Sequence, residues 1–161
     1  MNESDKKWMS VAVAEAARAR DIDEVPIGAC VVSETGELIA AACNRTIINN
    51  DPTAHAEILA LRAAAETIGN YRLTGVTVYS TIEPCAMCAG ALVNARVGRL
   101  VYGADDERFG AVKTNFGIGV TNVLNHQIKI EGGVMADECR QVMQEFFRNK
   151  RRKLDNEGAS N

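Results

Sequence analysis

The sequence predicts an α/β fold: a three-layer α/β/α sandwich around a five-stranded mixed sheet. Two observations lead to this class. Segments whose apolar residues recur at helical spacing alternate with short runs of β-branched and apolar residues. The later runs are apolar nearly throughout, as strands need to be when helices cover both faces of their sheet. The expected order is helix, hairpin, helix, strand, helix, strand, loop, strand and helix, which suits one layered domain.

The first half of the chain contains a helix, a hairpin and a second helix. Helical apolar spacing predicts the first helix at residues 4–20. The segment VPIGACVVSETGELIAAACN (25–44) has two apolar runs around Glu34-Thr35-Gly36, which is typical of a hairpin. Residues 51–53, Asp-Pro-Thr, form a loop, and the second helix is expected from His55 to about Thr67.

The second half alternates strands with helices. VTVYSTI, at 76–82, is rich in β-branched residues and predicts a buried strand that Pro84 ends. The remaining expected elements are a helix at 85–95, a strand at 98–104, a glycine-rich loop through Gly119, a short strand at 126–133 and an amphipathic helix at 136–154.

Length and composition indicate a soluble globular protein in a reducing compartment. The chain has 161 residues, 47% of them hydrophobic and 24% charged. We expect a single domain over residues 1–153 and a disordered tail over 154–161, which contains NEGASN. The chain contains no apolar run of about eighteen residues, so the sequence predicts no membrane span. The five cysteines do not form a small disulfide framework. A cytoplasmic location fits best, because a reducing cytosol leaves thiols available for metal binding or catalysis.

Charge is distributed unevenly along the chain. Residues 1–147 carry 13 basic and 19 acidic side chains, a net charge of −6, whereas residues 148–161 carry five basic and two acidic ones, a net charge of +3. A positive segment on an acidic body suggests a polyanionic partner. The same cations would also complement the carboxyl end of a helix. Both interpretations stay open at this point.

Two short motifs carry the chemistry. AHAEILAL (54–61) places His55 and Glu57 at the start of an apolar helix, and PCAMC places Cys85 and Cys88 at the start of another. A lone C-x2-C has several uses, among them a redox pair, half of a zinc site or two buried small residues. If both helices begin at one edge of the sheet, an imidazole and two thiolates converge, and such ligands suit Zn²⁺.

The number of ligands separates a structural metal from a catalytic one. A structural zinc site has four protein ligands, whereas a catalytic site keeps one position for water. The remaining residues offer no obvious fourth ligand, because Cys30, Cys43 and Cys139 lie in apolar segments and His126 is expected in a loop. We therefore expect a metal-bound water, with Glu57 placed to move its proton. Glu57 also suits the helix dipole as an acid of the first turn.

The pattern His55-x-Glu57 with Pro84-Cys85-x-x-Cys88 resembles the zinc signature of the cytidine and adenosine deaminase superfamily. Four longer segments, over roughly residues 8–153, are similar to the bacterial tRNA-specific adenosine deaminases. They are EVPIGACVV, CNRTIINNDPTAHAEILALR, NYRLTGVTVYSTIEPCAMCAGALVNARVGRLVYGA and ADECRQVMQEFFRNKRRK. The zinc signature identifies the superfamily, and the last two segments favour the tRNA branch.

The resemblance implies a cytidine deaminase-like fold, one Zn²⁺ per subunit and hydrolytic deamination of adenosine to inosine at the anticodon wobble position. Glu57 would be the catalytic acid/base, and His55, Cys85 and Cys88 the metal ligands. The partners would be a tRNA anticodon stem-loop and a second copy of the chain in a homodimer, with no membrane. The substrate contacts implied are Asn44, the Ala54 backbone, Asp106, Phe147, Arg148 and Arg151. Without the resemblance, Asn44 is more typical of a turn and Phe146 and Phe147 of a core.

The loop after VYGA departs from the family pattern. It reads DDERFGAVKTNFGIG, and Asp105 stands where a basic residue is common, which leaves its contact with nucleic acid open. Two alternative functions therefore remain: a deaminase of a free base or nucleoside of the guanine or cytosine type, and a non-catalytic tRNA-binding subunit. Glu57 argues against the non-catalytic subunit, since such a subunit needs no proton carrier. The basic segment argues against the free-base enzyme, since a small neutral substrate needs no cations.

Overall fold

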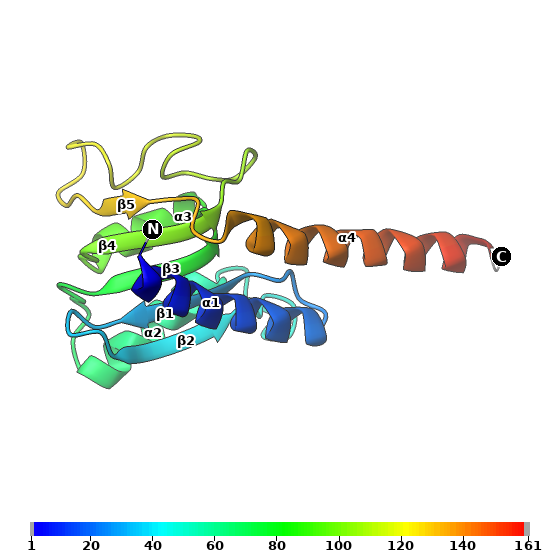
Figure 1. The fold of residues 1–161 in the computed structure, drawn as a ribbon, viewed down its shortest axis with the longest axis horizontal. Helices are drawn as coiled ribbons and strands as arrows, with labels where there is room; N and C mark the ends of the chain where they lie inside the picture. The colour runs from blue at the N-terminus through cyan, green and yellow to red at the C-terminus, as the bar shows by residue number, and fades with distance from the viewer. Residues whose placement is uncertain (1, 160–161) are drawn as a thin grey trace.

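The computed structural model describes residues 2–159 and confirms the predicted α/β class (Figure 1). One five-stranded mixed sheet has the order β2-β1-β3-β4-β5. The strands are β1 (Gly28–Val32), β2 (Leu38–Cys43), β3 (Thr77–Ile82), β4 (Arg99–Ala104) and β5 (Lys129–Glu131). The helices are α1 (Glu3–Asp21), α2 (Ala56–Ile68), α3 (Ala86–Asn94) and α4 (Ala136–Ala159).

Helices cover both faces of the sheet, as the apolar strands predicted. On one face α1 and α4 bury a cluster that includes Trp8, Met9 and Cys139. On the other face α2 and α3 bury a larger cluster that includes Leu61, Leu92 and strand residues such as Val78. Burial on both sides explains why strand β1 is apolar at nearly every position and fully buried.

The mixed character of the sheet comes from its two halves. The hairpin strands β1 and β2 are antiparallel, and β1 is also antiparallel to β3. From β3 onward the strands are parallel: α3 crosses over between β3 and β4, and the loop at 105–128 connects β4 to β5. Consequently β3 ends beside the beginning of α3, and α2, which packs on the same face, begins near that edge. This topology brings the two sequence motifs together.

Two expectations for the last third of the chain need correction. Residues 154–159 are not disordered but continue α4 to Ala159, while residues 160–161 lie outside the described part. Once a helix is nucleated, each further residue adds a hydrogen bond at low cost, so polar composition alone misplaced its end. Figure 1 shows α4 projecting well past the sheet. The strand expected at 126–133 is the shorter β5. Among residues 2–159, no helix has the length and apolar character to cross a bilayer.

Candidate metal centre and active site

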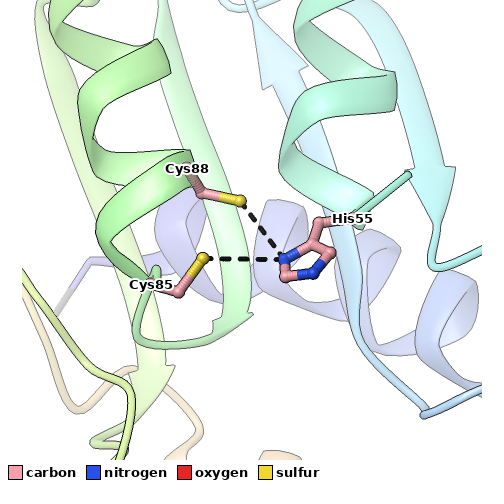
Figure 2. A group of neighbouring side chains, drawn as sticks. All are labelled: His55, Cys85 and Cys88. Carbon is pink, nitrogen blue, oxygen red and sulfur yellow. Dashed lines mark hydrogen bonds between the residues drawn. The ribbon is translucent and has the colours of Figure 1, made fainter. Parts of the chain in front are cut away.

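The site forms where two helices begin side by side. His55 is the N-cap residue of α2 and Cys85 is the N-cap residue of α3, both with extended backbone angles. Ser, Thr, Asp and Asn are favoured at N-caps because their side chains accept a hydrogen bond from the first turn. Neither His55 nor Cys85 makes such a bond. Both side chains are therefore available to point into the space between the helices, as Figure 2 shows.

Asn44 provides a cap for α2 from outside the helix. Its Oδ1 accepts a hydrogen bond from the Ala56 backbone N–H at 2.7 Å, and the side chain is buried. This bond satisfies one of the free N–H groups of the first turn. Asn44, which follows β2 directly, thus fixes the start of α2 and with it the position of His55.

The imidazole and the two thiols converge within bonding range of one ion. His55 Nδ1 lies 3.6 Å from Cys85 Sγ and 3.5 Å from Cys88 Sγ (Figure 2). The three ligand atoms all lie within 4.8 Å of one another. Typical zinc bond lengths and tetrahedral angles place a nitrogen and a sulfur ligand about 3.6 Å apart. The three side chains therefore fit a tetrahedral metal ion and leave a fourth position for another ligand.

Proton sharing among these groups favours ligand formation. The hydrogen bond from Cys88, assisted by His55, lowers the pKa of Cys85 to about 4. The hydrogen bond between Cys88 and Cys85 raises the pKa of Cys88. The hydrogen bond between His55 and Cys85 raises the pKa of His55. A metal ion that binds to these three side chains displaces the protons that they carry.

Glu57 is a buried carboxylate beside the three-residue group. It lies in the first turn of α2 and is only 4% exposed. Its Oε1 accepts a hydrogen bond from Ser80 Oγ at 3.0 Å, and its Oε2 lies 3.5 Å from Cys88 Sγ. Burial raises the pKa of Glu57, although the Ser80 hydroxyl opposes this change. A buried carboxyl group with a raised pKa is suited to general acid–base chemistry.

Glu83 organises the loop next to the site, and sequence analysis missed it. Its buried carboxylate accepts hydrogen bonds from the backbone N–H groups of Asp106 (3.1 Å), Lys113 (2.9 Å) and Thr114 (2.8 Å), and from the Thr114 hydroxyl. Although burial opposes it, these bonds lower the pKa of Glu83. The signal available in the sequence was an acid between a buried strand and Pro84, which is an unusual place for an unpaired charge.

Two acidic residues of the loop, Asp105 and Asp106, have partners within the chain. Asp105 Oδ1 accepts a hydrogen bond from Tyr102 at 2.9 Å, and its Oδ2 pairs with Lys113 at 3.2 Å. Asp106 Oδ1 accepts bonds from the Arg108 and Phe109 backbone N–H groups, both at 3.1 Å. The departure at Asp105 thus has a structural use, and Asp106 caps a turn of the loop.

Of the other predicted substrate contacts, Ala54 directly precedes His55, whereas Phe147, Arg148 and Arg151 lie on α4. Ala54 is buried; its N–H donates to the Asp51 carbonyl and its C=O accepts from the Arg45 N–H. Phe147 is 42% exposed on α4 and packs edge-on against buried Phe146, with ring centroids 5.3 Å apart. Phe147, Arg148 and Arg151 line a shallow hollow on α4. The core expectation therefore holds for Phe146 and is wrong for Phe147.

The remaining cysteines and histidine have the structural positions expected. Cys30, Cys43 and Cys139 are buried in the core, and none of them joins the three-residue group. His126 lies in the loop before β5, where its Nε2 is 2.7 Å from the Val97 carbonyl oxygen.

Comparison with known proteins identifies the family to which this chain belongs. A family model described as MafB19-like deaminase matches residues 3–151. The chain is 43% identical over 150 residues to the tRNA-specific adenosine deaminase of Haemophilus influenzae, covering 93% of this chain and 87% of the relative. The chain therefore belongs to the deaminase family and, within it, to the group of the tRNA-specific adenosine deaminases.

Solved structures agree with this class. The fold matches a tRNA:A34 deaminase, from a study of A-to-I editing at the wobble position of transfer RNA, with a TM-score of 0.81 and 42% identity. That match covers 84% of this chain and 98% of the other. The guanine deaminase of Nitrosomonas europaea matches with a TM-score of 0.75 and 26% identity, covering 88% and 83% of the two chains. The cytidine deaminase-like sandwich is thereby confirmed.

Proposed function

We propose that this protein catalyses the hydrolytic deamination of adenosine to inosine at the wobble position of a tRNA anticodon. The observation that carries the proposal is the convergence of His55, Cys85 and Cys88 beside the buried carboxylate of Glu57. The resemblance to tRNA-specific adenosine deaminases over nearly the whole chain supports the choice of substrate.

In this proposal His55, Cys85 and Cys88 hold one zinc ion (Zn²⁺) per chain. The nitrogen–sulfur separations suit tetrahedral zinc, and mixed imidazole and thiolate ligands are those that zinc prefers. Three protein ligands leave a position for water, and zinc bound there supplies an activated water as the nucleophile at neutral pH.

Glu57 carries the protons of the reaction. Its carboxylate takes one proton from the attacking water and gives it to the ring nitrogen next to C6, so that C6 becomes electrophilic. It then transfers the second water proton to the amino group, which leaves as ammonia. Adenosine and water become inosine and ammonia, and Glu57 returns to its starting state. A positioned acid/base of this kind contributes about 10²–10⁴ in rate.

The substrate contacts form two sets. Near the site, the Asn44 amide would bind the flipped base or its sugar while its Oδ1 continues to cap α2. The Ala54 carbonyl would contact the purine through its second lone pair. Asp106 would affect substrate binding indirectly, because its carboxylate caps a turn of the loop.

The second set lies on α4. Phe147 would offer an exposed ring for stacking, and Arg148 and Arg151 would meet phosphates of the anticodon stem-loop. Within residues 2–159, neither of these arginines forms an ion pair. By contrast Lys150 pairs with Asp23 at 2.7 Å. Lys150 thus pairs with the body of the protein, whereas Arg148 and Arg151 are available to a polyanion.

We propose further that the protein is a homodimer in the cytoplasm. An open apolar hollow between α2 and α3 is lined by Ile58, Leu61, Leu73 and Ala91, with Tyr71 67% exposed at its edge. A second copy covering this face would bury it. The tRNA substrate and the need for reduced thiol ligands favour the cytoplasm. Sedimentation of the wild type should give a dimer, and Tyr71→Glu should shift it to monomer; a wild-type monomer would refute this part.

The substrate is tested by comparing turnover of several candidate substrates. Purified protein is incubated with a tRNA anticodon stem-loop carrying wobble adenosine, with the same stem-loop carrying guanosine at that position, and with free adenosine, guanine and cytidine. We expect turnover of the adenosine stem-loop alone. Turnover of a free base with an inert stem-loop would favour the alternative that the guanine deaminase match represents. Stem-loop binding without turnover would favour a non-catalytic subunit.

A further inference from the structure

Ser80 is a polar residue in the middle of an apolar buried strand. It lies on β3 opposite Ala29 of β1 and Tyr102 of β4, and its exposure is 0%. A buried hydroxyl costs free energy unless it is hydrogen-bonded, so its partners define its use. The proposed reaction has so far given Ser80 no role.

The Ser80 hydroxyl has one proton and lies near two acceptors. Glu57 Oε1 is 3.0 Å away, and the Ile82 carbonyl oxygen is 2.8 Å away. The single proton is shared between these two acceptors, so the hydroxyl links the Glu57 carboxylate to the backbone of β3. On the other side of the carboxylate, Cys88 Sγ lies 3.5 Å from Oε2. The two oxygens of Glu57 thus have different neighbours.

This asymmetry matters because a glutamate carboxylate rotates freely about its last bond. The terminal torsion of Glu is broad, with no sharp preferred angle. Within residues 2–159, the side chains that hold Glu57 by hydrogen bonds are Ser80 and Cys88. The backbone N–H of Glu57 itself also contacts the carboxylate. Cys88 belongs to the proposed ligand set, and among these contacts Ser80 is the one that holds the carboxylate from the sheet.

We propose that Ser80 is a positioning residue for Glu57. Its hydroxyl holds Oε1 against β3 and thereby directs Oε2 toward the His55, Cys85 and Cys88 group, where the proton is exchanged. This inference rests on the proposed function, since it takes Glu57 as the proton carrier. Small errors in the placement of a reacting group reduce turnover steeply. Ser80 itself is fully buried and does not touch the substrate.

The test replaces the hydroxyl and compares it with a matched hydroxyl on the same strand. Ser80→Ala removes the bond to Glu57, and Ser80→Thr retains a hydroxyl on a side chain suited to a strand. Thr81→Val is the control, because Thr81 is equally buried but its Oγ1 accepts from the Gly28 N–H, away from Glu57. For each variant we would measure kcat, KM, metal content and thermal midpoint.

We expect Ser80→Ala to lower kcat at least tenfold, the scale of a hydrogen bond to a charged group, with KM and metal content unchanged. Ser80→Thr should recover most of kcat. Thr81→Val should lower the thermal midpoint and leave kcat unchanged. An unaltered kcat in Ser80→Ala would refute the proposal, as would equal losses of kcat in Ser80→Ala and Thr81→Val, which would indicate general loosening.

A crystal structure of the Ser80→Ala variant supplies a readout that needs no activity. The Glu57 carboxylate should occupy more than one orientation there, and a single unchanged orientation would refute the proposal. Turnover is measured on both the adenosine stem-loop and guanine, so that either substrate reports on Ser80. If the wild type acts on neither, the proposed function fails, while the crystal structure still decides the role of Ser80.

Discussion

Tyr79 and Ser80 are neighbours on β3 that contact buried carboxylates in opposite layers of the molecule. The Tyr79 hydroxyl donates to Asp5 of α1 at 2.8 Å, and the Ser80 hydroxyl donates to Glu57 of α2 at 3.0 Å. Asp5 is also paired with both terminal nitrogens of Arg99, at 2.7 and 2.8 Å. Within residues 2–159, no ion pair includes Glu57.

The two carboxylates differ accordingly in what they do. The hydrogen bonds from Arg99 lower the pKa of Asp5 and fix it as an anion that ties α1 to the sheet. Burial raises the pKa of Glu57, and no ion pair with a basic side chain of residues 2–159 fixes that carboxyl group as an anion. A fully paired charge stabilises a fold, whereas an incompletely paired one is available for chemistry.

The largest effect is expected from removing a metal ligand. Cys85→Ala should lose zinc and all measurable turnover, and it should lower stability because metal binding is coupled to folding. Metal analysis of protein purified without added zinc, together with stem-loop turnover, measures both losses. Cys43→Ala is the matched control, since that thiol is buried outside the group and should leave zinc near one ion per chain. Full activity in zinc-free wild type would contradict the metal assignment.

Glu57→Gln should separate chemistry from structure. We expect turnover to fall by at least ~10², since the amide cannot carry the proton, while zinc content and stem-loop affinity stay unchanged. Glu66→Gln, an exposed acid on the same helix, should have no effect. Loss of zinc together with turnover would show instead that Glu57 is a ligand or a structural residue.

Asp5→Asn should show the opposite pattern. Removing the charge leaves Arg99 with Glu131 as its remaining acidic partner, and we expect a loss of roughly 2 kcal/mol in the free energy of unfolding. The kcat of the folded protein should not change. Urea unfolding and stem-loop turnover measure the two quantities, with exposed Glu3→Gln of α1 as the control. A large fall in kcat at unchanged stability would place this cluster in the catalytic machinery.

The sequence predicted what depends on residue type and periodicity. Helical and strand patterns located the elements, and the rarity of an imidazole and a C-x2-C at two helix starts located the proposed ligands. Ser80 could not be found this way, because its role depends on which face of β3 packs on α2. The bond between Asp5 and Arg99 joins residues 94 positions apart, a pairing that only the sheet register creates. For the same reason, the sequence could not show that Lys150 of α4 pairs with Asp23, because that pairing depends on where Asp23 lies in the fold.

A smaller effect is expected from the exposed cations of α4. Replacing Arg148, Arg151 and Arg152 by alanine should weaken stem-loop binding and reduce the salt dependence of affinity, because each phosphate contact contributes a log–log slope of about −0.7. The slope should therefore become shallower by roughly 2. Lys150→Ala should change it little, since that cation pairs with Asp23. Unchanged slopes in the triple variant would exclude these arginines as phosphate contacts.

The smallest effect is expected in the pH dependence of the free energy of unfolding. Because the Arg99 hydrogen bonds lower the pKa of Asp5 from 3.8, the folded state holds this proton less tightly than the unfolded chain does. The stabilisation is therefore complete above the unfolded pKa and is lost as the pH falls through the lowered folded value. The difference in unfolding free energy between wild type and Asp5→Asn should stay constant from about pH 7 to 5 and narrow as the pH drops below about 4. Urea midpoints measured across this range for both proteins give the difference directly. If this difference in unfolding free energy became larger in acid, Asp5 would be held in the fold as a neutral acid. Asp5 and Glu57 would then no longer differ in their charge state.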